Sequence, residues 1–179
     1  MYFFKGNSSN TIYQFSWNGS SYAFGHNSIP VLTLVDMPAD ADASSFSMLH
    51  SGGNYHLYLR RLGDPKTLLQ FIWEPGTTTY KWGPGSWLKT LRVTDFPVDT
   101  DWSRWQMLHD GNAYRIYAFS YGANNRLYQG SWNSTLGVYQ YGFNSINQLD
   151  LIGFPPDSDV GRPAMLHDGR NYRFYFQML

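Results

Sequence analysis

The sequence predicts an all-β protein built from three related units, and three observations lead to this prediction. The tripeptide Met-Leu-His, followed by a turn and a tyrosine, recurs with its histidine at His50, His109 and His167, which are 59 and 58 residues apart. Apolar and polar residues alternate in segments such as 114–119, as in strands that bury one face. The 17 glycines and 9 prolines fall between such segments, and no stretch has a helical period. Self-similarity at a fixed period indicates an array of like units.

Composition limits the class of protein. The 179 residues, 42% of them hydrophobic, suffice for one domain over residues 1–179, and the 18% aromatic content favours strands. Thirteen basic and thirteen acidic residues cancel without a basic run, so we expect no nucleic-acid partner. The absence of cysteine excludes disulfides and thiolate metal sites. Residues 1–6 do not begin an export signal and no apolar run could span a membrane, so we expect a soluble chain of unknown localisation.

The strands of one unit can be assigned in order from the repeated residues. A strand with glutamine and tryptophan at fixed offsets covers 12–18, 68–74 and 127–133 in the three copies. A short aromatic strand that ends in glycine follows at 22–25, 80–83 and 139–142. A third strand leads into a proline loop at 34–38, 93–97 and 151–155. Each loop continues into two aspartates one residue apart, which are Asp40 and Asp42, Asp99 and Asp101, and Asp157 and Asp159.

A hairpin completes each unit. Residues 110–111 and 168–169 are Asp-Gly, and residues 51–53 are Ser-Gly-Gly, each between a Met-Leu-His strand and an aromatic strand. Asp-Gly accepts the positive backbone dihedrals of tight hairpin turns. We therefore expect about four strands in each unit.

We expect the units, at about 1–58, 59–117 and 118–179, to form a closed, pseudo-symmetric and propeller-like ring, because closure leaves few exposed sheet edges. The chain starts inside an aromatic strand at residues 2–6 and stops after the last hairpin. The N- and C-terminal strands should therefore complete one unit. The β-trefoil, the β-prism and a larger ring made from two chains are alternatives.

One unit runs from an inner strand through an Asp-Gly turn to a Tyr-x-Phe strand, an aromatic strand and a Phe-Pro loop that leads into an aspartate. The residues that carry this pattern are Phe96, Pro97, Asp101, Asp110, Gly111, Tyr117, Ala118, Phe119 and Gly122, echoed by residues 2–6. With these residues the unit resembles the hemopexin-type propeller blade. That family has four blades and usually a ring-closing disulfide, whereas this chain has three copies and no cysteine. Heme or axial-ion binding is therefore not implied here.

Two sets of repeated polar residues are candidate metal ligands. His50, His109 and His167 would converge on a metal such as zinc only if the three hairpin turns met on one axis. Their place directly before a turn favours turn capping instead. The paired aspartates offer hard oxygen ligands for calcium, but the residues after them differ, which favours backbone capping after a proline. We expect no metal and no cofactor.

Aromatic rings and amides are the candidate ligand-binding groups, because rings stack on sugar rings while amides bind their hydroxyls. Trp17, Trp73 and Trp132 repeat regularly, and Trp17 shares its strand face with Tyr13 and Phe15, so we assign the three tryptophans to the core. The predicted ligand-binding residues are Gln14, Gln70 and Gln129 together with the less regularly repeated rings Tyr80, Trp82, Trp87, Trp102, Trp105, Tyr121, Tyr139 and Tyr141.

No catalytic motif is present, and carboxylates that occur three times suit structure better than a single acid/base pair. The sequence therefore predicts a non-enzymatic, lectin-like module with up to three equivalent carbohydrate sites where neighbouring units meet. Several such sites would give avidity. The alternative is a protein-interaction or self-assembly scaffold that uses exposed aromatic residues. A hydrolase that uses the aspartate loops ranks third.

Overall fold

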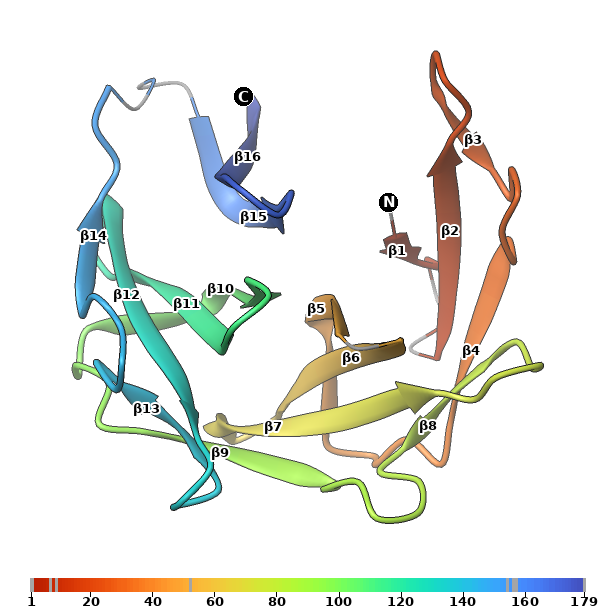
Figure 1. Cartoon of the computed structure of the whole chain (residues 1–179), viewed down its shortest axis with the longest axis horizontal. Helices are drawn as coiled ribbons and strands as arrows, with labels where there is room; N and C mark the ends of the chain where they lie inside the picture. The colour runs from red at the N-terminus through yellow and green to blue at the C-terminus, as the bar shows by residue number, and fades with distance from the viewer. Residues whose placement is uncertain are drawn as a thin grey trace.

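The chain forms strands and loops throughout the part that the computed structural model describes, residues 2–6, 8, 10–51, 53–153, 155 and 158–178 (Figure 1). Sixteen strands and no helix occur among these residues, which confirms the all-β prediction and leaves no helix there that could span a membrane. The strands are β1 (Tyr2–Phe4), β2 (Thr11–Trp17), β3 (Tyr22–Phe24), β4 (Val31–Val35), β5 (Ala41–Ser51), β6 (Asn54–Arg61), β7 (Asp64–Trp73), β8 (Thr79–Trp82), β9 (Thr90–Thr94), β10 (Thr100–His109), β11 (Tyr114–Ser120), β12 (Ala123–Asn133), β13 (Val138–Tyr141), β14 (Gln148–Asp150), β15 (Ser158–His167) and β16 (Tyr172–Met178).

The strands fall into four consecutive parts along an open arc (Figure 1). We call β1–β4 the first segment, β5–β9 the central segment, β10–β14 the third segment and β15–β16 the C-terminal hairpin. The unit boundaries expected after residues 58 and 117 fall inside β6 and β11.

Each segment is organised around the strand that carries its repeated glutamine. This strand, β2, β7 or β12, pairs with three others: an aromatic strand before it, a short strand after it and the last strand of the segment. The same pairings recur around β7 and β12. The registers agree as well, because a tyrosine lies opposite the glutamine each time, in the pairs Tyr2 with Gln14, Tyr58 with Gln70 and Tyr117 with Gln129.

Neighbouring segments are joined by short parallel ladders. The last strand of the first segment, β4, pairs with β8 of the central segment, and β9 pairs with β13 in the same way. Leu34 lies opposite Tyr80 in one ladder and Val93 opposite Tyr139 in the other, and all four side chains are buried. The two larger core clusters each draw residues from two segments. The core therefore lies at the junctions, and burial in one segment depends on the next.

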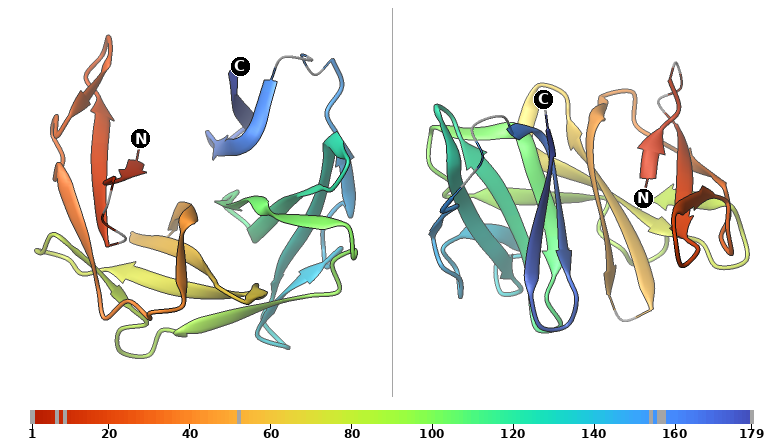
Figure 2. Two further views of the ribbon diagram at one scale, coloured as in Figure 1. Left: turned by 180° about the vertical axis from the view of Figure 1, so that it is seen from behind. Right: turned by 90° about the horizontal axis from the view of Figure 1, so that it is seen from above.

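The expected closed ring is not formed by the described strands. The C-terminal hairpin is a two-stranded sheet of its own, and none of the described pairings joins it to β1 or β2 (Figures 1 and 2). The expectation that the two ends complete one unit is therefore wrong for this structure. The physical reason is that β1 already occupies the edge of β2 that β16 would need, since Tyr2 lies opposite Gln14. A three-fold arrangement remains a prediction from the repeated sequence.

The predicted hairpins are confirmed. Strands β5–β6, β10–β11 and β15–β16 pair antiparallel across the expected turns, and Gly53, Gly111 and Gly169 have positive φ there. Each hairpin also has an irregularity in register near its start, after Asp42, Asp101 and Asp159.

A glycine at the end of the short aromatic strand fixes the loop that follows it. In the central segment the Gly83 N–H donates to the carbonyl of Gln70, and the Gln70 N–H donates to the carbonyl of Lys89. The counterparts Gly25 and Gly142 make the same bond to Gln14 and Gln129. A Cβ on Gly83, which has a φ of 47°, would lie 2.8 Å from the Lys89 Cα. Only glycine fits this close approach.

We therefore expect Gly83→Ala to lower the free energy of unfolding by about 3 kcal/mol, from the positive φ and the clash together. Gly122→Ala is the matched control, since Gly122 also has positive φ but a Cβ there would meet no atom within 4 Å. The control should lose about 1 kcal/mol. Chemical denaturation would measure both, and equal losses would contradict the close approach.

Candidate functional site

A pocket of about 500 Å³ lies between the third segment and the C-terminal hairpin. Strands β11 and β12, the loop before β14, and β15 and β16 supply its walls. Its lining combines polar side chains with rings, and consists of Arg115, Tyr117, Gln129, Asn144, Ser145, Ile146, Leu149, Met165, Tyr172 and Phe174. The pocket therefore lies where neighbouring parts of the chain meet.

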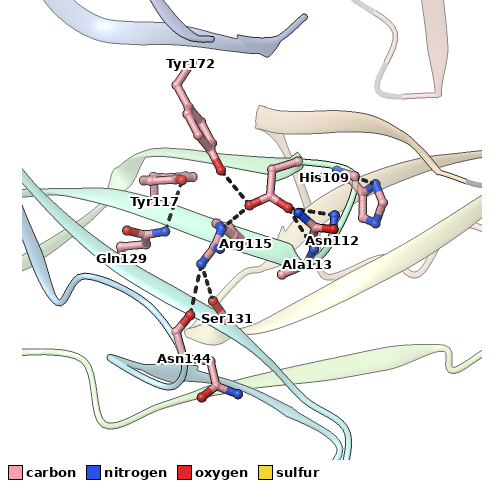
Figure 3. Close-up of polar contacts among 11 residues, drawn as sticks. His109, Asn112, Ala113, Arg115, Tyr117, Gln129, Ser131, Asn144 and Tyr172 are labelled. Carbon is pink, nitrogen blue, oxygen red and sulfur yellow. Dashed lines mark hydrogen bonds and ion pairs between the residues drawn. The ribbon is translucent and has the colours of Figure 1, made fainter. Parts of the chain in front are cut away.

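An ion pair beside the pocket, between Asp110 and Arg115 of the third segment, is hydrogen-bonded to Tyr172 of the C-terminal hairpin (Figure 3). Asp110 begins the β10–β11 turn, and its Oδ1 accepts the backbone N–H groups of Asn112 and Ala113 at 2.9 and 2.8 Å. Its Oδ2 accepts hydrogen bonds from Arg115 Nε and, at 2.6 Å, from the hydroxyl of Tyr172 on β16. Asp110 thus holds its own turn, the arginine and the hairpin at once.

Hydrogen bonding keeps this carboxylate ionised. Burial alone would raise the pKa of Asp110, but the bonds from Tyr172, Arg115 and the backbone outweigh it and hold the pKa well below its usual range. Burial, and then the hydrogen bond to Asp110, raise the pKa of Tyr172. The tyrosine therefore stays a neutral donor at physiological pH, and the charges of Asp110 and Arg115 cancel.

Arg115 is fixed further by its Nη1, which donates to Ser131 Oγ at 3.1 Å and to the Asn144 carbonyl at 3.3 Å (Figure 3). Its Nη2 makes no hydrogen bond with a described residue. Ser145 Oγ is buried and has no hydrogen-bond partner in the described part of the chain. Both groups therefore have hydrogen-bonding capacity that no described residue uses.

Gln129 lines the pocket from β12 and is hydrogen-bonded to other parts of its wall. With its amide oriented to satisfy its neighbours, the nitrogen donates to the Ile146 carbonyl at 3.0 Å and the oxygen faces Arg115 and Tyr117, each at 3.2 Å. Its hydrogen bonds are therefore largely satisfied within the protein. This predicted site residue lines the pocket, but it mainly positions Arg115 and the loop.

The corresponding positions between the central and third segments are filled. His56 and Tyr58 stand where Arg115 and Tyr117 stand, and both are buried with Gln70, whose Nε2 lies 3.0 Å from His56 Nδ1. Trp87, a predicted site residue, packs edge-on against His56 with ring centroids 5.1 Å apart. Tyr114 lies 2.7 Å from Ser51 Oγ, as Tyr172 lies against Asp110. The same strand arrangement therefore encloses a packed cluster of side chains at the junction of the central and third segments.

The other predicted aromatic residues are mostly placed differently from the expectation. Those expected on the surface but buried in the core are Tyr80, Trp102, Trp105 and Tyr139, so the expectation of exposure is wrong for them. Trp82 and Tyr141 are half-buried against core clusters, and Tyr121 is exposed at the β11–β12 turn. Gln14 is half-buried on β2. None of these lines the pocket.

The tryptophans assigned to the core divide in two. Trp73 and Trp132 pack against core clusters, each with its partner tyrosine, at centroid distances of 5.4 and 5.2 Å. Trp17 makes the same pair with Tyr22 at 5.3 Å but is 56% exposed. The core assignment of Trp17 is therefore wrong, because no neighbouring segment covers it in the described structure.

The three histidines do not come together. Each ring packs on the tyrosine opposite it in its hairpin, in the pairs His50 with Tyr55, His109 with Tyr114 and His167 with Tyr172. No group of three His, Cys, Asp or Glu side chains that could hold a metal occurs among the described residues.

In each described aspartate pair, the second aspartate caps the backbone and forms an ion pair. Asp42 accepts the N–H and hydroxyl of Ser44 and pairs with Arg60. Asp101 does the same with Ser103 and Arg104. These bonds are the turn capping that the sequence favours. Asp157 and the side chain of Asp159 lie outside the described residues.

Sequence reasoning missed Arg115, Ser145 and Tyr172, although one signal was present. The tripeptide Asn-Ser-Ile occurs at 27–29 and again at 144–146, each time after the repeated glycine. Both asparagines have positive φ, and Ser28 Oγ is buried without a described partner, as Ser145 Oγ is. Arg115 and Tyr172 gave no signal, because the contacts that bring them to the pocket, of Tyr172 with Asp110 and of Arg115 with Asn144, join residues distant in the sequence.

Comparison of the chain with protein-family models, with curated proteins and with solved structures found no match.

We expect Tyr172→Phe to lower the free energy of unfolding by about 1 to 2 kcal/mol, because it removes a hydrogen bond to a charged acceptor. Tyr55→Phe is the matched control, because Tyr55 packs on His50 in the first hairpin as Tyr172 packs on His167, and its side chain is exposed. Urea denaturation of the two variants would measure the difference. Equal stability of both would contradict the role of the Tyr172 hydroxyl.

The buried His56 predicts a pH dependence. Burial, and then the charges of His50 and His109, lower the pKa of His56 from 6.5 to about 4. The unfolded chain therefore takes up a proton at higher pH than the folded one, so stability falls as the pH drops from 6.5 to 4. We expect a loss of about 2 kcal/mol across this window, seen as a lower denaturation midpoint.

In His56→Gln this slope between pH 6.5 and 4 should largely disappear, whereas His26→Gln, at a partly exposed histidine of the first segment, should retain it. Carboxylates whose pKa is lowered, such as Asp101, add a separate loss of stability that begins near pH 5 and should remain in both variants, so the two slopes are compared above that pH. An unchanged slope in His56→Gln would assign the effect to another group.

Proposed function

We propose that the protein is a non-enzymatic carbohydrate-binding module and that the pocket between the third segment and the C-terminal hairpin is its binding site. The observation that carries the proposal is the composition of this one pocket. Rings of Tyr117, Tyr172 and Phe174 share it with Arg115 and Ser145. Sugar recognition requires apolar ring faces for the C–H side of the ligand and planar or hydroxyl groups for its hydroxyls.

The charge of the site favours a neutral ligand. Asp110 neutralises Arg115, so the pocket offers directed N–H donors without a free positive charge. A hydroxylated ligand suits the unpaired Arg115 Nη2 and Ser145 Oγ, because a sugar hydroxyl both donates and accepts. A phosphate or carboxylate ligand would have to compete with Asp110 for the guanidinium.

The proposal contains no catalytic step. The carboxylate that pairs with the pocket's arginine, Asp110, is committed to Arg115, Tyr172 and two backbone groups, and its lowered pKa makes it a poor general acid. Of the up to three equivalent sites that the repeated sequence predicts, the one between the central and third segments is filled by His56 and Trp87, whereas Asn27 and Ser28 of the first segment are the counterparts of Asn144 and Ser145. Several sites on one chain would give the avidity that shallow pockets need.

The test is a glycan array with the intact chain and a variant that fills the pocket. For any glycan that the intact chain binds, Ser145→Leu should lower the affinity at least tenfold. The larger side chain occupies the pocket, and the unpaired hydroxyl is lost. Ser86→Leu is the matched control, since Ser86 is the exposed serine of the corresponding loop in the central segment. Circular dichroism would check that both fold.

Absence of binding to every glycan would overturn the proposed function. Binding that Ser145→Leu leaves unchanged would overturn the assignment of the site.

A further inference from the structure

We infer that the two ends of the arc bind each other between molecules, so that a second copy of this chain pairs its first segment with the third segment and hairpin of the first copy. This inference does not depend on carbohydrate binding. It rests on a comparison of the two junctions inside the chain with the two faces at its ends.

Each internal junction joins the outer edge of a last strand to the outer edge of a short aromatic strand. Strand β4 pairs with β8, and β9 pairs with β13, in the same register. One last strand and one short aromatic strand lack such a partner among the described strands. Among the described strands, β14 pairs only with β12, and β3 pairs only with β2. Figures 1 and 2 place these two edges at opposite ends of the arc.

The free edges have the registers that a third ladder needs. Asp150 lies opposite Arg126 as Arg92 lies opposite Thr67 and Thr33 opposite Thr11. Extending the internal pattern places Leu151 opposite Tyr22 of the second copy, as Leu34 lies opposite Tyr80 and Val93 opposite Tyr139. The Leu151 N–H is bonded inward to Asn125, so the next amide, that of Ile152, faces the free edge.

The exposure of the end residues supports the same pairing. Tyr80 and Tyr139 are each 2% exposed at the internal junctions, whereas their counterpart Tyr22 is 53% exposed and stands beside the exposed Trp17. Ile152, beyond the end of β14, is 97% exposed. Contiguous exposed rings indicate an interaction surface, and an unpaired strand edge offers a template for pairing with another chain.

The C-terminal hairpin supplies the inner part of this junction. Tyr175 on β16 is the sequence counterpart of Tyr58 and Tyr117, which lie opposite glutamines and are buried, yet Tyr175 is exposed. In the second copy the place opposite Gln14 is held by Tyr2 of the three-residue strand β1. The seven-residue β16 of one copy displaces β1 from β2 of the other copy. The short β1–β2 ladder is then replaced by a longer ladder between β16 and β2.

A second copy is the occupant that the residues specify, because both halves of the missing junction are present in one chain but at opposite ends. Contact between two different patches is head-to-tail, and such contacts close into a ring only when the rotation between successive copies returns to the first copy.

The test is the mass in solution, measured by sedimentation velocity over a range of concentrations. The intact chain should associate. Tyr22→Lys should abolish association because it places a charge opposite Leu151, and Leu62→Lys, at an exposed position of the β6–β7 turn in the central segment, should leave it intact. Ile152→Pro removes the outward amide and should also abolish association, whereas Ile152→Ala keeps this amide and should not.

Mixing separates head-to-tail contact from any other mode. Tyr22→Lys retains an intact β14 edge and Ile152→Pro an intact β3 edge, so the mixture should form one heterodimer although neither variant associates alone.

Phe3→Pro, which loosens β1 from β2, should lower the dissociation constant of the otherwise intact chain.

A chain that stays monomeric at every concentration, or association that survives Tyr22→Lys and Ile152→Pro, would overturn the inference. A mixture that stays monomeric would overturn head-to-tail pairing, and a dissociation constant that does not fall in Phe3→Pro would overturn the exchange of β1 for β16.

Discussion

The rest of the structure depends on one strand in each segment that holds three others. Strands β2, β7 and β12 each pair with a preceding strand, a short following strand and the last strand of their segment. Because that last strand presents its second edge outward, each segment offers a parallel ladder to the next. Hydrophobic burial follows this geometry, since Leu34 and Tyr80 are covered only where two segments meet. The core is thus distributed over junctions rather than placed inside units.

Side chains on this shared frame decide whether a junction is closed or open. At the junction of the central and third segments, neutral His56 and Gln70 pack tightly and Trp87 lies against them. At the next one, Arg115 replaces the histidine and requires the counter-charge of Asp110. A buried guanidinium needs several acceptors, and the turn and loop that supply them stand around a pocket. Two adjacent junctions of like geometry therefore differ in what they can bind.

The sequence predicted local features well where neighbouring residues decide them. The hairpin turns, the glycines with positive φ and the capping by Asp42 and Asp101 are all contacts within a few residues. Exposure was predicted poorly, and Trp17 and Tyr80 show why. Regular repetition placed Trp17 in the core, but the side chain is exposed because no described neighbour covers its segment. Tyr80 was expected on the surface and is buried by β4, a strand some fifty residues away.

The amino-acid sequence by itself determined the strand content, the hairpins and the repeated order of strands, because alternation and turn chemistry act over short distances. Only the tertiary structure decided that the chain forms an open arc, that β1 occupies the place on β2 for which β16 is also suited, and that Arg115, Ser145 and Tyr172 share a pocket. These features depend on which segment lies beside which. That choice is made by ladders and hydrogen bonds between residues far apart in the chain, and no local pattern encodes it.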